Sequence, residues 1–281
     1  MRGLRRFILF SVLAGSLQLT CHAQLPGDLR IQEDSLSSLF YGLAQTRDGM
    51  EQQSISEDIA GLLNVLLKNR DTFDYGFDSI RNVGKIYSAD RHIRIFTWNI
   101  IYADGSNGYY GFIQYLPDPD KDPLVFRLYD RSDRIVDPEQ AIVGASEWYG
   151  SLVYDIIDQS IDNTMCYVLL CYDPNNLFIS RRIIDILYFN DKPEPVFGKP
   201  VFLYKNNVLC RVLFQYSARA QMNLRWDPSL KMIVFDHLSP VSSSFQGNFQ
   251  YYGPDFSYDG FRFEDGMWQL QQDIDVRNAP R

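Results

Sequence analysis

Residues 92–116, HIRIFTWNIIYADGSNGYYGFIQYL, decide the fold class of this chain. Two runs of aromatic and β-branched residues, 92–102 and 108–116, flank the turn-forming segment Asp104-Gly105-Ser106-Asn107. Such residues favour the pleated, half-buried surface of a strand. The pattern predicts an antiparallel hairpin that is closed by a short loop rather than by a two-residue turn.

The same pattern of short apolar runs and turn chemistry continues from residue 83 to residue 270. No Pro-, Gly- or Ser-rich stretch interrupts the series as an interdomain linker would. We expect one continuous antiparallel sheet system, which is a twisted meander, a sandwich or a partly closed barrel. The further predicted strands are 124–129, 148–157, 165–172, 183–189, 200–204, 208–216, 222–226, 231–237, 261–263 and 267–270.

Two runs of apolar residues at helical spacing precede the strands. Asp34 or Ser35 is the expected cap of the first helix, and Asp48-Gly49 is its expected end. Ser54 and Glu57 form a capping-box pattern for the second helix. We predict a helical hairpin packed on the sheet, and therefore an α+β fold that is mainly β. The apolar residues of the two runs are Leu36, Leu39, Phe40 and Leu43, then Ile55, Ile59, Leu62, Leu63 and Leu66.

The start of the chain has the parts of a secretory signal: basic residues, an apolar run over 7–19, and small residues at Cys21 and Ala23. The apolar run is shorter than the roughly 20 residues that span a bilayer. We expect cleavage after Ala23, a periplasmic location and no membrane span in the mature protein. Acylation of Cys21 as a lipoprotein fits less well, because Gln18 and Thr20 stand where aliphatic and small residues are needed.

The expected organisation is a signal peptide at 1–23, a helical segment at 24–82, and a β-rich region at 83–281 that shares one domain with the helices. The 281 residues carry a formal net charge of −8. An acidic surface argues against nucleic acid or anionic lipid as the main partner, because both require clustered Lys and Arg.

Cysteine and histidine are scarce. Cys166, Cys171 and Cys210 follow the predicted leader and allow one disulfide at most. Cys166 and Cys171 would face opposite sides of a strand, so we expect buried, small apolar side chains instead. No His-Glu-x-x-His or paired Cys-x-x-Cys motif occurs, so we expect no metal site with histidine or cysteine ligands.

Two motifs come close to known chemistry without matching it. Asp236-His237 resembles half of a hydrolase triad, but adjacent strand residues point to opposite faces and no Gly-x-Ser-x-Gly is present. Residues 118–122, DPDKD, alternate carboxylates as calcium loops do, but the required Gly and Glu positions are not filled. We expect no cofactor, with calcium as the one alternative.

The stretch YYGPDFSYDGF, residues 251–261, is the most unusual in the sequence. Dense tyrosine with Asp and Gly in a loop is typical of a sugar-binding platform, and the same composition also covers a β core. Paired carboxylates there would support glycoside hydrolysis at a separation of about 5 to 9 Å. The candidate ligand-binding residues are Glu147, Trp148, Asp255, Tyr258 and Asp259.

Six stretches carry a resemblance: Trp148-Tyr149-Gly150, 152–157, Gly198-Lys199-Pro200-Val201-Phe202, 222–240, 251–261 and Asp275-Val276-Arg277-Asn278. Together they resemble an uncharacterised family of exported proteins from Bacteroidota, to which no activity is assigned. The resemblance covers most of the chain beyond residue 83 and implies secretion and a single folded unit.

The sequence thus predicts an exported cell-envelope protein that is a non-enzymatic β-rich binding or interaction module, because no motif required by a known chemistry is present. The alternative is a glycan-binding protein or a carboxylate-dependent glycoside hydrolase. The expected partner is an envelope protein or a glycan. The alternative requires Glu147, Asp255 and Asp259 to share one concave pocket with Trp148 or Tyr258.

Overall fold

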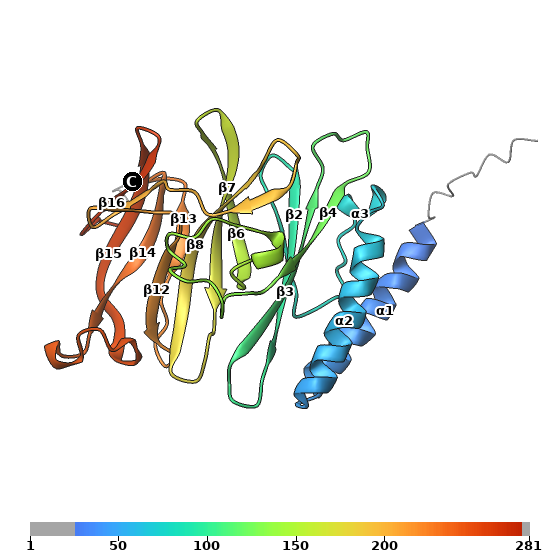
Figure 1. Ribbon diagram of the computed structural model, residues 1–281, viewed down its shortest axis with the longest axis horizontal. Helices are drawn as coiled ribbons and strands as arrows, with labels where there is room; N and C mark the ends of the chain where they lie inside the picture. The colour runs from blue at the N-terminus through green and yellow to red at the C-terminus, as the bar shows by residue number, and fades with distance from the viewer. Residues whose placement is uncertain (1–25, 277–281) are drawn as a thin grey trace, which may run out of the picture.

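The computed structural model describes residues 26–276, with the helices at one end of its long axis and the strands stacked beyond them (Figure 1). The predicted signal peptide and its cleavage site lie outside the described residues. The predicted fold is confirmed: the protein is mainly β, and an N-terminal helical hairpin packs on antiparallel sheets. The helices are α1 (Pro26–Gln45), α2 (Gly49–Leu66) and α3 (Asp71–Asp74).

The strands of residues 26–276 form three sheets, which we name from their places along the long axis. Pairing is antiparallel throughout the named strands, except between β10 and β16. The helix-side sheet contains β1 (Gly84–Tyr87), β2 (Ile93–Ile101), β3 (Asn107–Tyr115) and β4 (Leu124–Tyr129). The middle sheet contains β5 (Val143–Gly144), β6 (Leu152–Ile161), β7 (Thr164–Asp173), β8 (Ile179–Phe189), β9 (Pro195–Phe197) and β12 (Val212–Ser217). The distal sheet contains β10 (Phe202–Tyr204), β11 (Asn207–Leu209), β13 (Leu224–Asp227), β14 (Met232–Pro240), β15 (Tyr252–Glu264) and β16 (Met267–Gln271).

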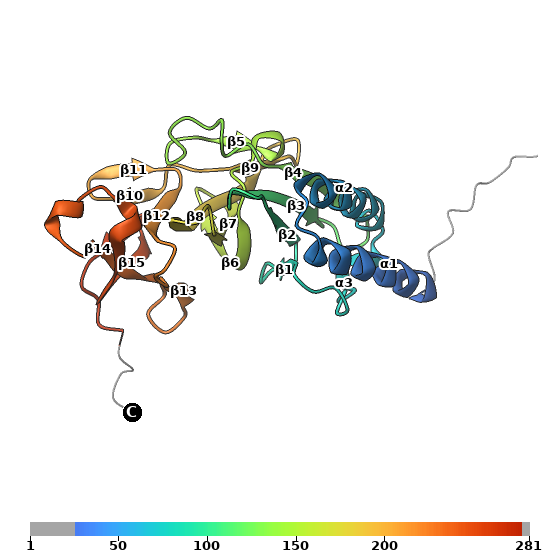
Figure 2. The same ribbon diagram turned by 90° about the horizontal axis from the view of Figure 1, so that it is seen from below.

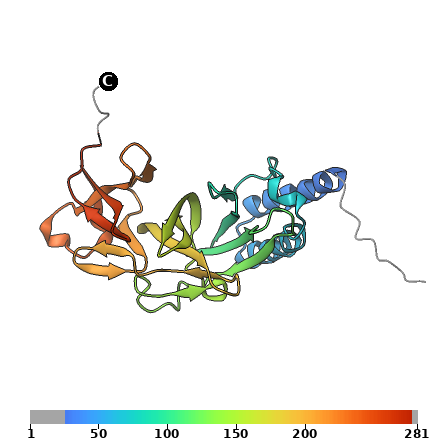
Figure 3. The same ribbon diagram turned by 90° about the horizontal axis from the view of Figure 1, so that it is seen from above.

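The helices and the three sheets follow one another as four layers, and the views from below and from above show this order (Figure 2, Figure 3). Three apolar cores lie between the layers. The first joins the helices to the helix-side sheet, the second joins that sheet to the middle sheet, and the third joins the middle and distal sheets. Two of the sheets are therefore apolar on both faces.

Strand β2 shows how one strand serves two cores. Phe96 and Trp98 point toward the helices, whereas Ile93 and Ile95 point toward the middle sheet. Alternate side chains of a strand point to opposite faces, so an uninterrupted apolar run covers both. The run 92–102 has apolar residues on both faces because its strand is internal to the stack.

Strand β7 repeats this arrangement one layer further along. Cys166 packs in the core with the distal sheet, and Cys171 packs in the core with the helix-side sheet. Both thiols are buried and free, as is that of Cys210. The prediction of buried, unpaired cysteines is confirmed.

A buried arginine ties the segment after α2 to the sheet. The Arg94 guanidinium donates to the backbone carbonyls of Thr72, Tyr75 and Gly76 at 3.1, 2.7 and 3.2 Å. Burial lowers the pKa of Arg94 to about 10, which still leaves the side chain charged at neutral pH. These bonds give the buried guanidinium acceptors in place of water.

The strands form three stacked sheets rather than the single sheet of a meander. Because β2 and β7 are apolar on both faces, the helix-side sheet and the middle sheet each need a packed layer on both sides. The stacked arrangement provides these layers. None of the three sheets closes into a barrel. Residues 208–216 accordingly divide into β11 of the distal sheet and β12 of the middle sheet. The break falls at Arg211, whose buried guanidinium donates to Asp185 at 2.7 Å and to the Pro138 carbonyl at 2.6 Å.

The helix boundaries also differ from those expected. Helix α1 begins at Pro26, well before the predicted cap at Asp34 or Ser35. Asp48 does not end a helix but caps the start of α2, where its carboxylate accepts from the backbone N–H of Met50 and Glu51, each at 2.9 Å. Ser54 therefore lies inside α2.

We predict that Leu63→Asp destabilises the protein by at least about 3 kcal/mol, because it places a charge in the core between α2 and the sheet. The Leu63 side chain is 1% exposed, whereas Val65 on the same helix is 67% exposed. Chemical denaturation of both aspartate variants measures the difference. Equal stability of Leu63→Asp and Val65→Asp would show that α2 does not pack on the sheet.

Candidate functional site

The predicted site residues Glu147 and Trp148 lie in different environments. Trp148 is 1% exposed and belongs to the core between the helix-side and middle sheets, so its ring faces no ligand. Glu147 ends a short 3₁₀ helix, Ala145–Glu147, and is exposed beside Arg131 and Arg134 in a surface depression.

The other three predicted residues lie on β15, so the expectation that 251–261 is a loop is wrong beyond Tyr251. This stretch pairs with β14, which gives its backbone a ladder of hydrogen bonds. Asp259 is buried and accepts from the Asp273 N–H at 3.1 Å, and burial raises the pKa of Asp259. Tyr258 lines a small depression on the distal sheet. None of five surface depressions in the described residues contains more than one of the predicted residues, which the structure therefore does not bring together.

Asp255 has a partner that the sequence did not reveal. His237 Nδ1 lies 2.8 Å from Asp255 Oδ2, while the Ser257 hydroxyl donates to Oδ1 at 2.8 Å. An irregularity in the β14–β15 pairing between Asp236 and Leu238 is the local feature that accompanies this contact. Partial burial acts to raise the pKa of Asp255, but the hydrogen bonds from Ser257 and His237 outweigh it and lower the pKa to about 2.

Asp236 takes no part in this pair. Its carboxylate accepts from the Asn223 N–H at 2.8 Å and from the Asn223 side-chain amide at 3.1 Å. The prediction that Asp236 does not orient His237 is thus confirmed. Because Ser257 donates to Asp255 and not to the imidazole, the three side chains do not form the nucleophile–base–acid order of a triad.

We predict that His237→Ala raises the pKa of Asp255 from about 2 toward 3.8, because one hydrogen bond and one source of positive charge are lost. A carboxylate whose pKa is lower in the folded than in the unfolded state stabilises the fold at pH values above its unfolded-state pKa. This contribution is lost as the pH falls through the folded-state pKa. The stability difference between wild type and variant should therefore shrink between about pH 4 and pH 2. Carboxyl carbon NMR titration measures the pKa directly.

The control for this titration is His92→Ala, because His92 pairs with Asp90 at 3.2 Å and not with Asp255. An Asp255 pKa that is the same in His237→Ala as in the wild type would refute the assignment of His237 as its partner.

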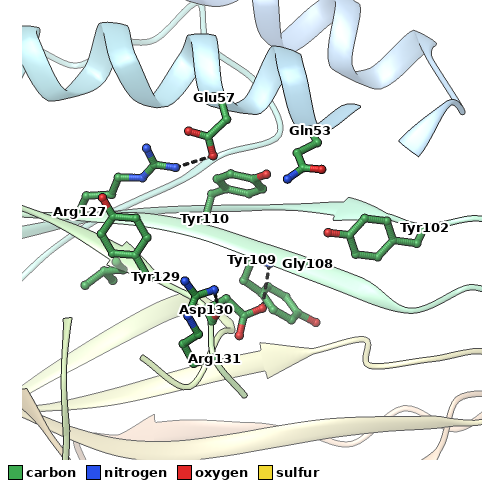
Figure 4. A pocket seen from close by; sticks show the side chains of 11 residues that line it. Gln53, Glu57, Tyr102, Gly108, Tyr109, Tyr110, Arg127, Tyr129, Asp130 and Arg131 are labelled. Atoms are coloured by element: carbon green, nitrogen blue, oxygen red, sulfur yellow. Dashed lines mark hydrogen bonds and ion pairs between the residues drawn. The ribbon is translucent and has the colours of Figure 1, made fainter. Parts of the chain in front are cut away.

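The most developed candidate site is a cavity of about 370 Å³ between α2 and the helix-side sheet. Figure 4 shows side chains from the helix pointing toward those of the sheet across this space. Helix α2 contacts β2, β3 and β4, and the cavity lies beside those contacts. Its lining residues are Gln53, Glu57, Tyr102, Gly108, Tyr109, Tyr110, Arg127, Leu128, Tyr129, Asp130 and Arg131.

Helix α2 supplies the polar wall of the cavity. Gln53 and Glu57 are four residues apart, so they lie on one face of the helix. Glu57 accepts from Arg127 of β4 at 2.6 Å, and the Arg127 guanidinium lies 4.9 Å from the centre of the Tyr129 ring. The ion pair thus spans from the helix to the edge strand and holds the guanidinium beside an aromatic ring.

Tyr110 forms part of the floor and is fixed from behind. Its ring stacks on the buried Trp98, with 5.3 Å between ring centres and 13° between ring planes. Phe40 of α1 meets the same indole edge-on at 5.7 Å. Burial and the nearby Glu57 raise the pKa of Tyr110 to about 12, so its hydroxyl stays a hydrogen-bond donor at neutral pH. The core between helices and sheet therefore sets the position of a cavity residue.

Asp130 is a structural carboxylate at the lower rim. It accepts from the backbone N–H of Tyr109, Ser132 and Gly150 at 3.2, 3.0 and 3.3 Å, and also from the Ser132 hydroxyl. A side chain at Gly150 would collide with the Asp130 carboxylate, so the bare backbone permits this approach. The bonds fix the chain where it leaves β4 and carries Arg131 to the cavity.

Tyr102 closes the cavity from the β2–β3 hairpin. A Cβ atom at Gly108 would lie 2.7 Å from the Tyr102 hydroxyl, so only glycine lets this ring lie over β3. Burial followed by the charge of Asp130 raises the pKa of Tyr102. Sequence reasoning missed the whole cavity, because its residues come from four separate segments.

The described residues hold no group of three or more His, Cys, Asp or Glu side chains arranged for a metal ion. In the suspected calcium loop, Asp118 pairs with Lys121 at 2.9 Å and Asp122 accepts from the Arg70 N–H at 3.2 Å. Within residues 26–276, no helix has the length and hydrophobicity needed to cross a membrane.

No family model matches the chain, and no curated protein sequence matches it. The resemblance to exported Bacteroidota proteins therefore stays a prediction.

Proposed function

We propose that the chain is a non-enzymatic saccharide-binding protein and that the cavity between α2 and the helix-side sheet is its binding site. One observation carries the proposal: tyrosine side chains and a carboxylate–guanidinium pair line a single cavity. Aromatic rings offer flat apolar faces to the C–H groups of a pyranose, and paired polar groups bond its hydroxyls.

The size and charge of the cavity suit such a ligand. Its volume of about 370 Å³ falls within the range typical of small-molecule sites, about 300 to 1,000 Å³. Glu57 and Asp130 balance Arg127 and Arg131 in formal charge, so the lining carries no net charge. A neutral, hydroxyl-rich ligand fits this balance better than a polyanion, which binds to clustered cations.

Binding is favoured over hydrolysis by the condition of the two carboxylates. Glycosidases of the common type need one carboxyl group as an acid and another as a base or nucleophile. In this cavity Glu57 is engaged by Arg127, and Asp130 accepts from four protein donors. Neither group is left free to attack or protonate a substrate.

The predicted leader and the resemblance to exported proteins support an envelope location, where glycans are abundant. Peptidoglycan fragments and envelope oligosaccharides are therefore the first ligands to test.

We predict that one class of envelope saccharide raises the melting temperature of the purified chain, because a ligand that binds only the folded state stabilises it. Calorimetric titration of that saccharide should show affinity reduced at least about tenfold, or roughly 1.4 kcal/mol, in both Tyr129→Ala and Arg127→Ala. Tyr41→Ala is the matched control, because Tyr41 is 70% exposed on α1 and lies outside the cavity.

Two results would contradict the proposal. One is the absence of any thermal shift across neutral and acidic glycans and peptidoglycan fragments. The other is a saccharide that binds Tyr129→Ala and Arg127→Ala as tightly as it binds the wild type.

A further inference from the structure

A second depression, of about 500 Å³, lies on the middle and distal sheets and shares no lining residue with the cavity. It forms where the turn between β7 and β8 meets the end of β12 and the connection from β14 to β15, toward the lower end of the molecule in Figure 1. Its lining residues are Leu177, Phe178, Ser217, Arg219, Ala220, Val241, Gln250, Tyr251, Tyr252 and Gly253.

The depression gathers large apolar side chains that are open to solvent. Leu177, Phe178 and Val241 are 68%, 65% and 76% exposed. Single exposed apolar residues are ordinary on a protein surface, but several around one depression mark an interaction site. None of these three side chains belongs to the three apolar cores of the described residues.

The walls of the depression are held in place by backbone hydrogen bonds. The Ala218 N–H donates to the Phe178 carbonyl at 2.9 Å, and the Val241 N–H donates to the Tyr251 carbonyl at 3.0 Å. The Tyr251 ring stacks on Phe245 with 4.1 Å between ring centres. The apolar surface is therefore preformed, which lowers the entropic cost of docking.

Arg219 is the only charged side chain in the lining. It forms no ion pair with any other described residue. The whole chain has a formal net charge of −8, whereas the lining of this depression carries one positive charge and no negative one. Its complement is a carboxylate that adjoins a large apolar group.

We propose that this depression docks an extended peptide segment of another protein, in which a large apolar residue lies next to an acidic one. The apolar side chain packs between Phe178, Val241 and Tyr251, and the acidic side chain meets Arg219. Ser217 and Gln250 lie among the apolar residues and can bond peptide groups. An acyl chain has no polar groups, so it would bury Ser217 and Gln250 without replacing the hydrogen bonds that they make to water. This cost in free energy disfavours a lipid as the ligand.

Panning a random linear peptide library displayed on phage against the full chain tests the proposal. The enriched peptides should share an apolar residue adjacent to Asp or Glu. Synthetic versions of these peptides should bind Arg219→Glu and Phe178→Ser at least tenfold more weakly than the wild type. Leu203→Ser is the control, because Leu203 is also partly exposed, at 37%, but lies outside the depression.

Both test residues are exposed, so the melting temperatures of their variants should equal that of the wild type, and saccharide binding in the cavity should be unchanged. The proposal is overturned if no peptide is enriched, if the enriched peptides lack an acidic residue, or if they bind Arg219→Glu as tightly as the wild type. A saccharide that loses affinity through Phe178→Ser would also overturn it, because the depression would then be a glycan site.

Discussion

Burial of both faces of the helix-side and middle sheets is the constraint on which the rest of the structure depends. Phe96, Trp98 and Phe112 cover one face of the helix-side sheet and are each at most 1% exposed beneath the helices. Exposing side chains of this size costs roughly 1.5 to 3 kcal/mol each. The helices therefore contribute to the stability of the sheet, because without them this apolar face would be exposed to water.

The same constraint shapes the cavity. Alternation along β3 sends Tyr109 toward the middle sheet, where its hydroxyl bonds to Asp173, and sends Tyr110 toward α2. Tyr110 belongs at once to the core, through its stacking on Trp98, and to the cavity floor. A site built on packed strands and one helix is positioned more rigidly than a site on loops, and rigid positioning is what selective binding of a sugar ring requires.

The sequence predicted the elements better than their assembly. The helix and strand runs depend on local periodicity, and β2, β3, β4 and β7 lie within a residue or so of the expected ranges. The partition into three sheets depends on pairings between distant segments, such as β12 with β8 and β10 with β16, which no local pattern encodes. The cap at Asp48 was visible in the sequence, but its position between two helical runs allowed it to be assigned to the wrong helix.

The candidate site was predicted poorly for a similar reason. Local density of tyrosine and aspartate drew attention to 251–261, where cross-strand pairing turns Asp259 inward and joins Asp255 to His237. The cavity instead combines α2, the β2–β3 hairpin, β3 and β4. One signal was available: the uninterrupted Gly108-Tyr109-Tyr110 places a tyrosine on each face of a strand, and the one facing the helices meets Glu57 and Arg127 only after folding.

A crystal structure of the chain with a bound saccharide tests the central claim most directly. The account predicts a sugar ring within about 4 Å of Tyr110 or Tyr129, with hydroxyls bonded to Glu57 or Arg127. A sugar ring seated instead on Asp255 and Tyr258 of β15, with the cavity between α2 and the sheet unchanged, would contradict it.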